Sequence, residues 1–113
     1  PDVGPGEPAP PFAADRDARD GATVVALRGE LDLHSSGVLL AATTDIAAGS
    51  RLVLDLSGLG FVDSAGLRAL MNLDLRARDE GFELVLAAPG PAVLRVLRLT
   101  GFDKRLPIED AVR

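Results

Sequence analysis

The side chains best suited to chemistry are an acid and a hydroxyl at one junction. Asp63 and Ser64 follow a hydrophobic run and precede a segment with helical periodicity. A hydroxyl at or near a helix start lies at the positive end of the helix dipole, which stabilises an anion attached to that oxygen. A phosphoryl group would add about −1.5 to −2 charge and three acceptor oxygens there. Ser64 is therefore a candidate modification site, and repulsion by Asp63 would let the modification change a binding surface without disturbing the core.

Two other roles for Ser64 have to be weighed. Asp and Ser are among the commonest residues that cap a helix start, so Ser64 could simply be a cap. A serine hydrolase would require the pattern G-x-S-x-G, but the residue two places before Ser64 is Val62. The sequence therefore argues against an enzyme and leaves the cap and the modification site open.

Other polar residues give weaker signals. His34 is the only histidine, and we interpret it as a solvated or capping loop residue rather than a general base. Asp32 and Asp63 lack the histidine or third acid that would support a metal pair, so we expect no metal site. The glycines match neither G-x-G-x-x-G nor a P-loop, so we expect no nucleotide cofactor and interpret Gly58 and Gly60 as turn glycines.

Composition limits the class of protein. A chain of 113 residues with 47% hydrophobic residues can bury one domain core. It has no cysteine, and its net charge of −5 argues against binding to nucleic acid or to anionic lipid. The apolar runs are far shorter than the roughly 20 residues of a membrane span, and the start lacks the layout of a signal peptide. We expect a cytoplasmic protein.

Residues 1–11 are rich in Pro and Gly and are predicted to form a flexible tail, with a single domain over 12–113. Strands and helices are expected to alternate, which is typical of an α/β fold with parallel crossovers. Strands are predicted at 12–19, 22–33, 51–56, 82–87 and 105–108, turns at 20–21 and 57–60, and helices from 35 or 36 to 48, over 64–80 and from about 89 to 100.

The helix over 64–80 is predicted to be amphipathic. Asp74 falls inside its apolar arc, so this face is imperfect, and the charged residues between 76 and 80 are expected to form a solvated face. The residues expected to face the core are Leu67, Leu70, Met71 and Leu75.

The segment "LVLDLSGLGFVDSAGLRAL", with "GELDL" before it and "LRLTGFDKRLPI" after it, resembles the STAS family, most closely its bacterial anti-sigma factor antagonists. The resemblance covers residues 12–113. It implies a small α/β domain with a sheet of four or five mostly parallel strands and helices packed mainly on one face.

The resemblance also implies a role for each matching residue. Ser64 stands at the position that the partner phosphorylates, the partner being an anti-sigma factor that is also a GHKL-type serine kinase using ATP and Mg²⁺. Asp63 and Asp32 would lie near the kinase-facing surface. In such a system the unmodified form binds the anti-sigma factor, the phosphorylated form does not, and a metal-dependent serine phosphatase resets the switch.

The contact surface is expected to surround Ser64. Ala65 stands where many relatives carry a second Ser or Thr, so Ser64 would carry the switch alone, and Gly66 permits the close approach of another backbone. Apolar residues beside an exposed helix start suit the centre of a small interface. The surrounding residues predicted to contact a partner are Leu33, Val62, Leu67 and Arg68. A different class of function stays open: a STAS scaffold subunit of a lipid-transport or stress-sensing complex, without phosphorylation.

Overall fold

The protein, described here by a computed structural model, forms a five-stranded sheet with helices. The structure describes residues 11–112, so the predicted tail lies outside the described residues except for Pro11. The elements are β1 (Ala13–Arg19), β2 (Ala22–Leu31), α1 (Ser36–Ala42), β3 (Arg51–Val62), α2 (Ser64–Glu80), β4 (Glu83–Ala87), α3 (Pro91–Leu99), α4 (Phe102–Arg105) and β5 (Ile108–Glu109).

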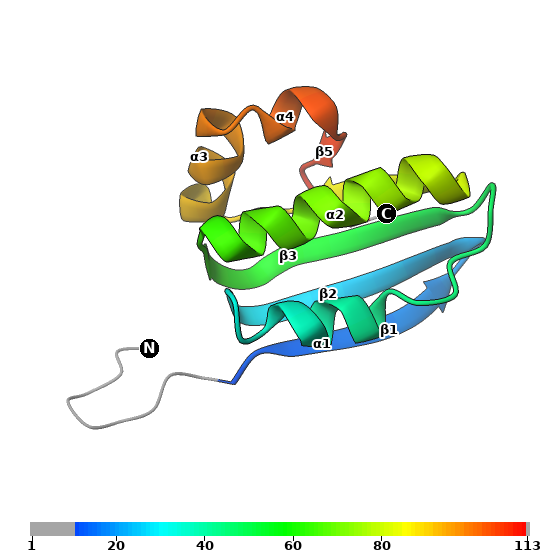
Figure 1. Cartoon of the computed structure of the whole chain (residues 1–113), viewed down its shortest axis with the longest axis horizontal. Coiled ribbons are helices and arrows are strands. Elements are labelled where there is room, and N and C mark those ends of the chain that lie inside the picture. Colours follow the sequence, from blue (N-terminus) through cyan, green and yellow to red (C-terminus); the bar gives the residue numbers. More distant parts are fainter. Residues whose placement is uncertain (1–10, 113) are drawn as a thin grey trace.

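The strands lie in the order β1-β2-β3-β4-β5, so β3 is central (Figure 1). β1 and β2 form the predicted antiparallel hairpin, and every other neighbouring pair is parallel. The hairpin turn has positive φ at both Asp20 (45°) and Gly21 (79°), as a two-residue type I′ turn requires. The predicted sheet of mostly parallel strands is confirmed.

The main core lies between one face of the sheet and the helices. Because strand side chains alternate between faces, Leu52 and Leu54 join the helix residues Leu70 and Leu97 in one cluster, whereas Val53 does not. Val53 belongs to a smaller cluster on the opposite face, which contains no helix residue. The helices therefore pack on one face, with α2 running along β3 (Figure 1).

β3 is longer than the sequence pattern predicts. The predicted turn over 57–60 is wrong, because β3 continues through it to Val62 with two register shifts relative to β2. Gly58 lies in this irregular stretch, and a Cβ at that position would lie 2.9 Å from the carbonyl oxygen of Leu27. Glycine is required there for the close approach of two strands at a bulge, not for a turn.

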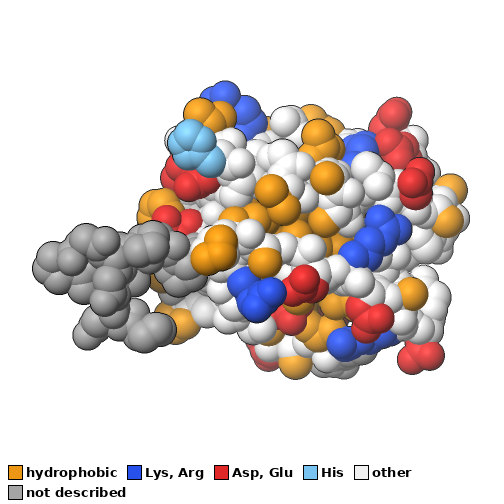
Figure 2. All heavy atoms as spheres, turned by 90° about the horizontal axis from the view of Figure 1, so that it is seen from below, with side chains coloured by type: hydrophobic (Ala, Val, Ile, Leu, Met, Phe, Trp, Pro, Cys, Tyr) orange, Lys and Arg blue, Asp and Glu red, His pale blue; other side chains and the backbone are white. Residues whose placement is uncertain are grey.

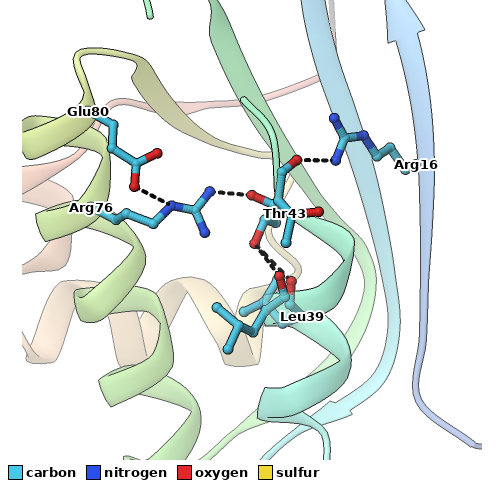
Figure 3. A network of polar contacts seen from close by, with 7 residues as sticks. Arg16, Leu39, Thr43, Arg76 and Glu80 are labelled. Carbon is cyan, nitrogen blue, oxygen red and sulfur yellow. Dashed lines mark hydrogen bonds and ion pairs between the residues drawn. The ribbon is translucent and has the colours of Figure 1, made fainter. Parts of the chain in front are cut away.

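α1 is shorter than predicted and ends at Ala42 instead of 48. The hydroxyl of Thr43 donates to the carbonyl oxygen of Leu39 at 2.9 Å, and the side chain of Arg76 donates to the Thr43 carbonyl oxygen. Arg16 approaches from the other side and donates to the Thr44 carbonyl oxygen at 2.5 Å (Figure 3). Two arginines from distant elements thus bind carbonyl groups after the helix, and the sequence gives no local sign of them.

α2 has the predicted bounds but a different buried face. It ends at Gly81, whose φ of 80° is the left-handed conformation typical of a helix end. Met71 and Leu75 are exposed, contrary to prediction. The buried positions are Gly66, Leu70, Leu73, Asp74 and Ala77. The helix is therefore rotated so that an acid faces inward.

The inward acid, Asp74, links α2 to the C-terminal helices. Its side chain is 3% exposed, and its two oxygens accept from Arg78 at 3.1 Å and from Arg105 at 3.0 Å. Arg105 belongs to α4, a short helix that the sequence did not predict. The charge is therefore buried with two cationic partners that remain partly in solvent, a geometry that stabilises it.

We predict that Asp74→Ala lowers the free energy of unfolding by about 1.5–3 kcal/mol, because two charge-assisted hydrogen bonds are lost. Asp79→Ala, the same substitution at an exposed position of the same helix, is expected to change it by less than about 0.5 kcal/mol. Urea unfolding of the three proteins provides the measurement. Equal losses in both variants would contradict a structural role for Asp74.

Candidate functional site

The candidate site lies where two neighbouring parallel strands end. Leu31, the last residue of β2, pairs with Val62, the last residue of β3. The next residues, Asp32 and Asp63, therefore begin two adjacent loops at the carboxyl edge of the sheet, where sites of open α/β sheets gather. The structure thus brings the two acids that the sequence singled out to one edge.

Asp63 caps α2, and Ser64 does not. The Oδ1 atom of Asp63 accepts from the N–H of Gly66 at 2.8 Å, and the Asp63 backbone is extended, as expected for an N-cap. Ser64 is the first residue of the helix and is exposed. Because Asp63 supplies the cap, the hydroxyl of Ser64 is presented to solvent at the positive end of the helix dipole.

Gly66 sets how closely α2 approaches the sheet. A Cβ on this residue would lie 2.3 Å from the carbonyl oxygen of Leu31 and 2.8 Å from a methyl group of Val62. The N–H of Asp63 also donates to the Leu31 carbonyl oxygen, at 3.2 Å. Gly66 thus permits the close approach of another backbone, and that backbone belongs to β2 of the same chain.

Asp32 stabilises the loop after β2, which begins beside Asp63. Its Oδ1 atom accepts from the N–H groups of His34 at 2.9 Å and Ser35 at 3.0 Å, and from the Ser35 hydroxyl at 3.0 Å. The Ser35 hydroxyl also donates to the Glu30 carbonyl oxygen at 2.7 Å. The Ser35 N–H, followed by smaller effects of the Ser35 hydroxyl, the His34 N–H and the His34 charge, holds the pKa of Asp32 below its usual value, against partial desolvation.

The other predicted contact residues divide by exposure. Leu33 is 73% exposed, and Arg68 is exposed as well. Val62 is buried against the first turn of α2, and Gly66 is a buried residue of that turn. The side chains of Ala65 and Leu67 are partly exposed. Leu33 and Arg68 thus lie at the surface, whereas Val62 and Gly66 support it from below.

Sequence reasoning missed the apolar surface of α1. Val38 and Leu40 are 45% and 61% exposed, and the helix carries no charged residue. A groove of about 390 Å³ runs between α1 and α2, with Leu40 and Ala69 among its lining residues. Figure 2, viewed from the side on which α1 lies, shows hydrophobic side chains near the middle of this face with charged side chains beside them and at the rim. The sequence "SGVLLAA" contains no charged residue, and this was the signal that could have predicted an apolar exposed surface on α1.

The described residues form neither a cluster of metal ligands nor a helix that could span a membrane. Nowhere between residues 11 and 112 do three or more His, Cys, Asp or Glu side chains gather closely enough to hold a metal ion. Within the same residues, no helix combines the length and the apolar character required to cross a membrane.

The fold and site define a small α/β domain that presents a serine at a helix start, and comparison with known proteins identifies the class. The chain belongs to the STAS family, since the family model described as "Mlab, STAS domain" matches residues 14–109. It is similar to the anti-sigma F factor antagonist of Paenibacillus polymyxa, with 34% identity over 94 residues and 80% of each chain covered.

Solved structures agree with this assignment. An anti-sigma factor antagonist from Mycobacterium paratuberculosis has a TM-score of 0.74 and 32% identity, covering 90% of this chain and 88% of the other. The antagonist SpoIIAA in its unphosphorylated form shares the fold, with a TM-score of 0.61, 22% identity and coverage of 85% and 87%.

We predict that Gly66→Ala lowers the free energy of unfolding by about 1–3 kcal/mol, because the new methyl group must push α2 away from the Leu31 carbonyl oxygen. Gly37→Ala is the matched control: it lies within α1, and its Cβ would meet nothing within 4 Å. That control is expected to leave stability unchanged or to raise it by up to about 1 kcal/mol. Similar effects of the two substitutions in urea unfolding would refute the close-approach argument.

The Asp32 loop gives a pH-dependent prediction. Because the folded-state pKa of Asp32 is lowered, its carboxylate stabilises the fold above the unfolded-state pKa of about 4, and this contribution is lost as the pH falls through the folded-state value. Asp32→Asn is expected to be less stable than the wild type near neutral pH, with a gap that narrows on acidification to about pH 3. The measurement is urea unfolding across this range, and a gap that stays constant or widens would contradict the role of Asp32.

Proposed function

We propose that this protein is an anti-sigma factor antagonist: a non-enzymatic cytoplasmic binding domain, switched off by phosphorylation of Ser64. The partner is an anti-sigma factor that is also a GHKL-type serine kinase. The unmodified domain binds this partner and thereby frees the sigma factor. The similarity to anti-sigma factor antagonists over most of the chain supports this assignment.

The observation that carries the proposal is the division of roles between Asp63 and Ser64. A serine that caps its helix has its hydroxyl engaged by a backbone N–H. Here Asp63 accepts from Gly66, and Ser64 is exposed one residue later. The hydroxyl can therefore reach a kinase without any change in the fold.

In the proposed reaction the γ-phosphoryl group passes from ATP to the Oγ atom of Ser64. ADP leaves, and the hydroxyl proton passes to a base that the kinase supplies. A metal-dependent serine phosphatase later hydrolyses the ester with water, which releases inorganic phosphate and restores the hydroxyl.

The phosphorylated surface is expected to bind its partner more weakly. Asp32 and Asp63 already place two acids at this edge, and a dianion added next to Asp63 gives a concentrated negative charge. A partner surface that fits the hydroxyl would have to bury that charge, and one unpaired charge at an interface costs about 2–5 kcal/mol. We propose that Leu33, Leu67, Arg68 and Ala65 form the contact with the partner, and that Val62 and Gly66 hold its base in place.

The direct test incubates the domain with its cognate anti-sigma kinase, ATP and Mg²⁺ and locates phosphate by mass spectrometry. We expect modification at Ser64 alone and none in Ser64→Ala. Absence of phosphate, or phosphate only at Ser35 or Ser36, which lie on the adjacent loop and helix start, would reject the proposal.

Affinity measurements with the same kinase test the switch separately. Ser64→Ala is expected to bind as the wild type does, and Ser64→Asp to bind at least tenfold more weakly, about 1.4 kcal/mol. Equal affinities would count against a switch at this residue. Co-purification with a transporter ATPase, without phosphorylation, would favour the STAS scaffold of a lipid-transport or stress-sensing complex instead.

A further inference from the structure

Arg68 lies one helical turn after the candidate phosphorylation site. Ser64 and Arg68 are separated by four positions on α2 and are both exposed, so they share one face of the helix. Side chains of a helix lean toward its N-terminus, so the guanidinium of Arg68 extends over the turn that carries Ser64. Once Ser64 carries a phosphate, the pair has the favourable order, with the anion four residues before the cation.

The guanidinium of Arg68 is not engaged elsewhere in the described part of the chain. Seven ion pairs link described residues, and none of them includes Arg68. By contrast Arg76 and Arg78, on the same helix, pair with Glu80 and Asp74. Among the residues that the structure describes, Arg68 is therefore a cation without an ion-pair partner, and it lies beside the proposed switch.

The charges around Ser64 give this arginine a role. In the two segments that meet at this edge, residues 30–37 and 61–70, Arg68 is the only Lys or Arg. Asp32 and Asp63 supply two carboxylates at this edge, and Asp63 directly precedes Ser64. A phosphate on Ser64 would therefore lie near two like charges and one opposite charge.

We propose that, once Ser64 is phosphorylated, Arg68 binds the phosphate across one helical turn. This inference rests on the proposed function and adds the regulation of the same site. Phosphorylation then changes the surface in two ways, since it adds a dianion and also withdraws an exposed cation from any acidic group of the partner. An arginine suits this task because its planar fork binds two phosphate oxygens at once.

The test uses the full chain with phosphoserine placed at position 64 during translation, so that no kinase is needed. The second ionisation of the phosphate, with a pKa near 6, is followed by ³¹P NMR over a pH titration. A nearby cation favours the dianion, so the wild-type phosphate is expected to titrate about 0.2–0.4 pH unit below that of Arg68→Gln. Arg68→Lys, which keeps the charge, should retain much of this shift.

Arg78→Gln provides the matched control, because it removes an arginine of the same helix that lies about 21 Å from Ser64 along the helix axis. It should titrate as the wild type does. His34, Asp32 and Asp63 are present in every variant, so their effects cancel in the comparison. In about 1 M salt the difference due to Arg68 should largely vanish.

Identical titrations of the wild type and Arg68→Gln would overturn the inference, as would an equal shift in Arg78→Gln. Because the phosphate is installed without the kinase, this result is independent of the phosphorylation assay. Failure of that assay would reject the proposed function while leaving the Ser64–Arg68 pair measurable.

Discussion

The arrangement of the site depends on one backbone contact, the approach of the first turn of α2 to the end of β2. Only a residue without a side chain fits at Gly66, because the Leu31 carbonyl oxygen occupies the space that a Cβ would need. This contact fixes where α2 begins relative to the sheet. Because α2 begins there, Asp63 is the N-cap residue and Ser64 is the first residue of the helix, with its hydroxyl not used for capping.

The same geometry explains why a charge change at Ser64 can remain local. The Oδ1 atom of Asp32 accepts from N–H groups of its own loop, and the Oδ1 atom of Asp63 accepts from the N–H of Gly66 in α2, so neither acid must move to accommodate a neighbour. Beneath them, Leu31 and Val62 are buried in the core. A modification at the surface therefore acts on a rigid base and changes what a partner meets rather than the fold.

The surface around this base has two parts with different chemistry. Close to Ser64 it is charged, with acids of the two loops and a single arginine. Further along α1 it is apolar, with Val38 and Leu40 exposed beside a groove against α2. Apolar area supplies affinity while charge controls selectivity, so a partner that covers both parts could bind well and still respond to one phosphate.

The fold was largely predictable from the sequence where local signals decide the structure. The bounds of α2 follow from Asp63 and Gly81, and the hairpin follows from its Asp-Gly turn. Predictions failed where distant residues decide the outcome. Two arginines bind carbonyl oxygens of the residues that follow α1. Pairing with β2 extends β3 through a glycine-containing segment whose sequence is typical of a turn.

The same distinction applies to the site. Asp32, Asp63 and Ser64 could be identified from their residue types and their positions after strands. The sequence could not decide whether Asp63 or Ser64 caps the helix. Capping depends on the direction of one side chain, and both residue types cap well. The inward rotation of Asp74 likewise depends on Arg105, a partner 31 positions away in the chain.

We propose that the Ser64 hydroxyl stands on a preformed surface and accepts a phosphoryl group without a change in fold. The most direct measurement compares the ¹H–¹⁵N correlation spectra of the unmodified chain and of the chain phosphorylated at Ser64. We expect shifts confined to residues 30–37 and 61–70, with the amides of β1, β4 and α3 unchanged. Shifts spread through those distant elements would contradict the account.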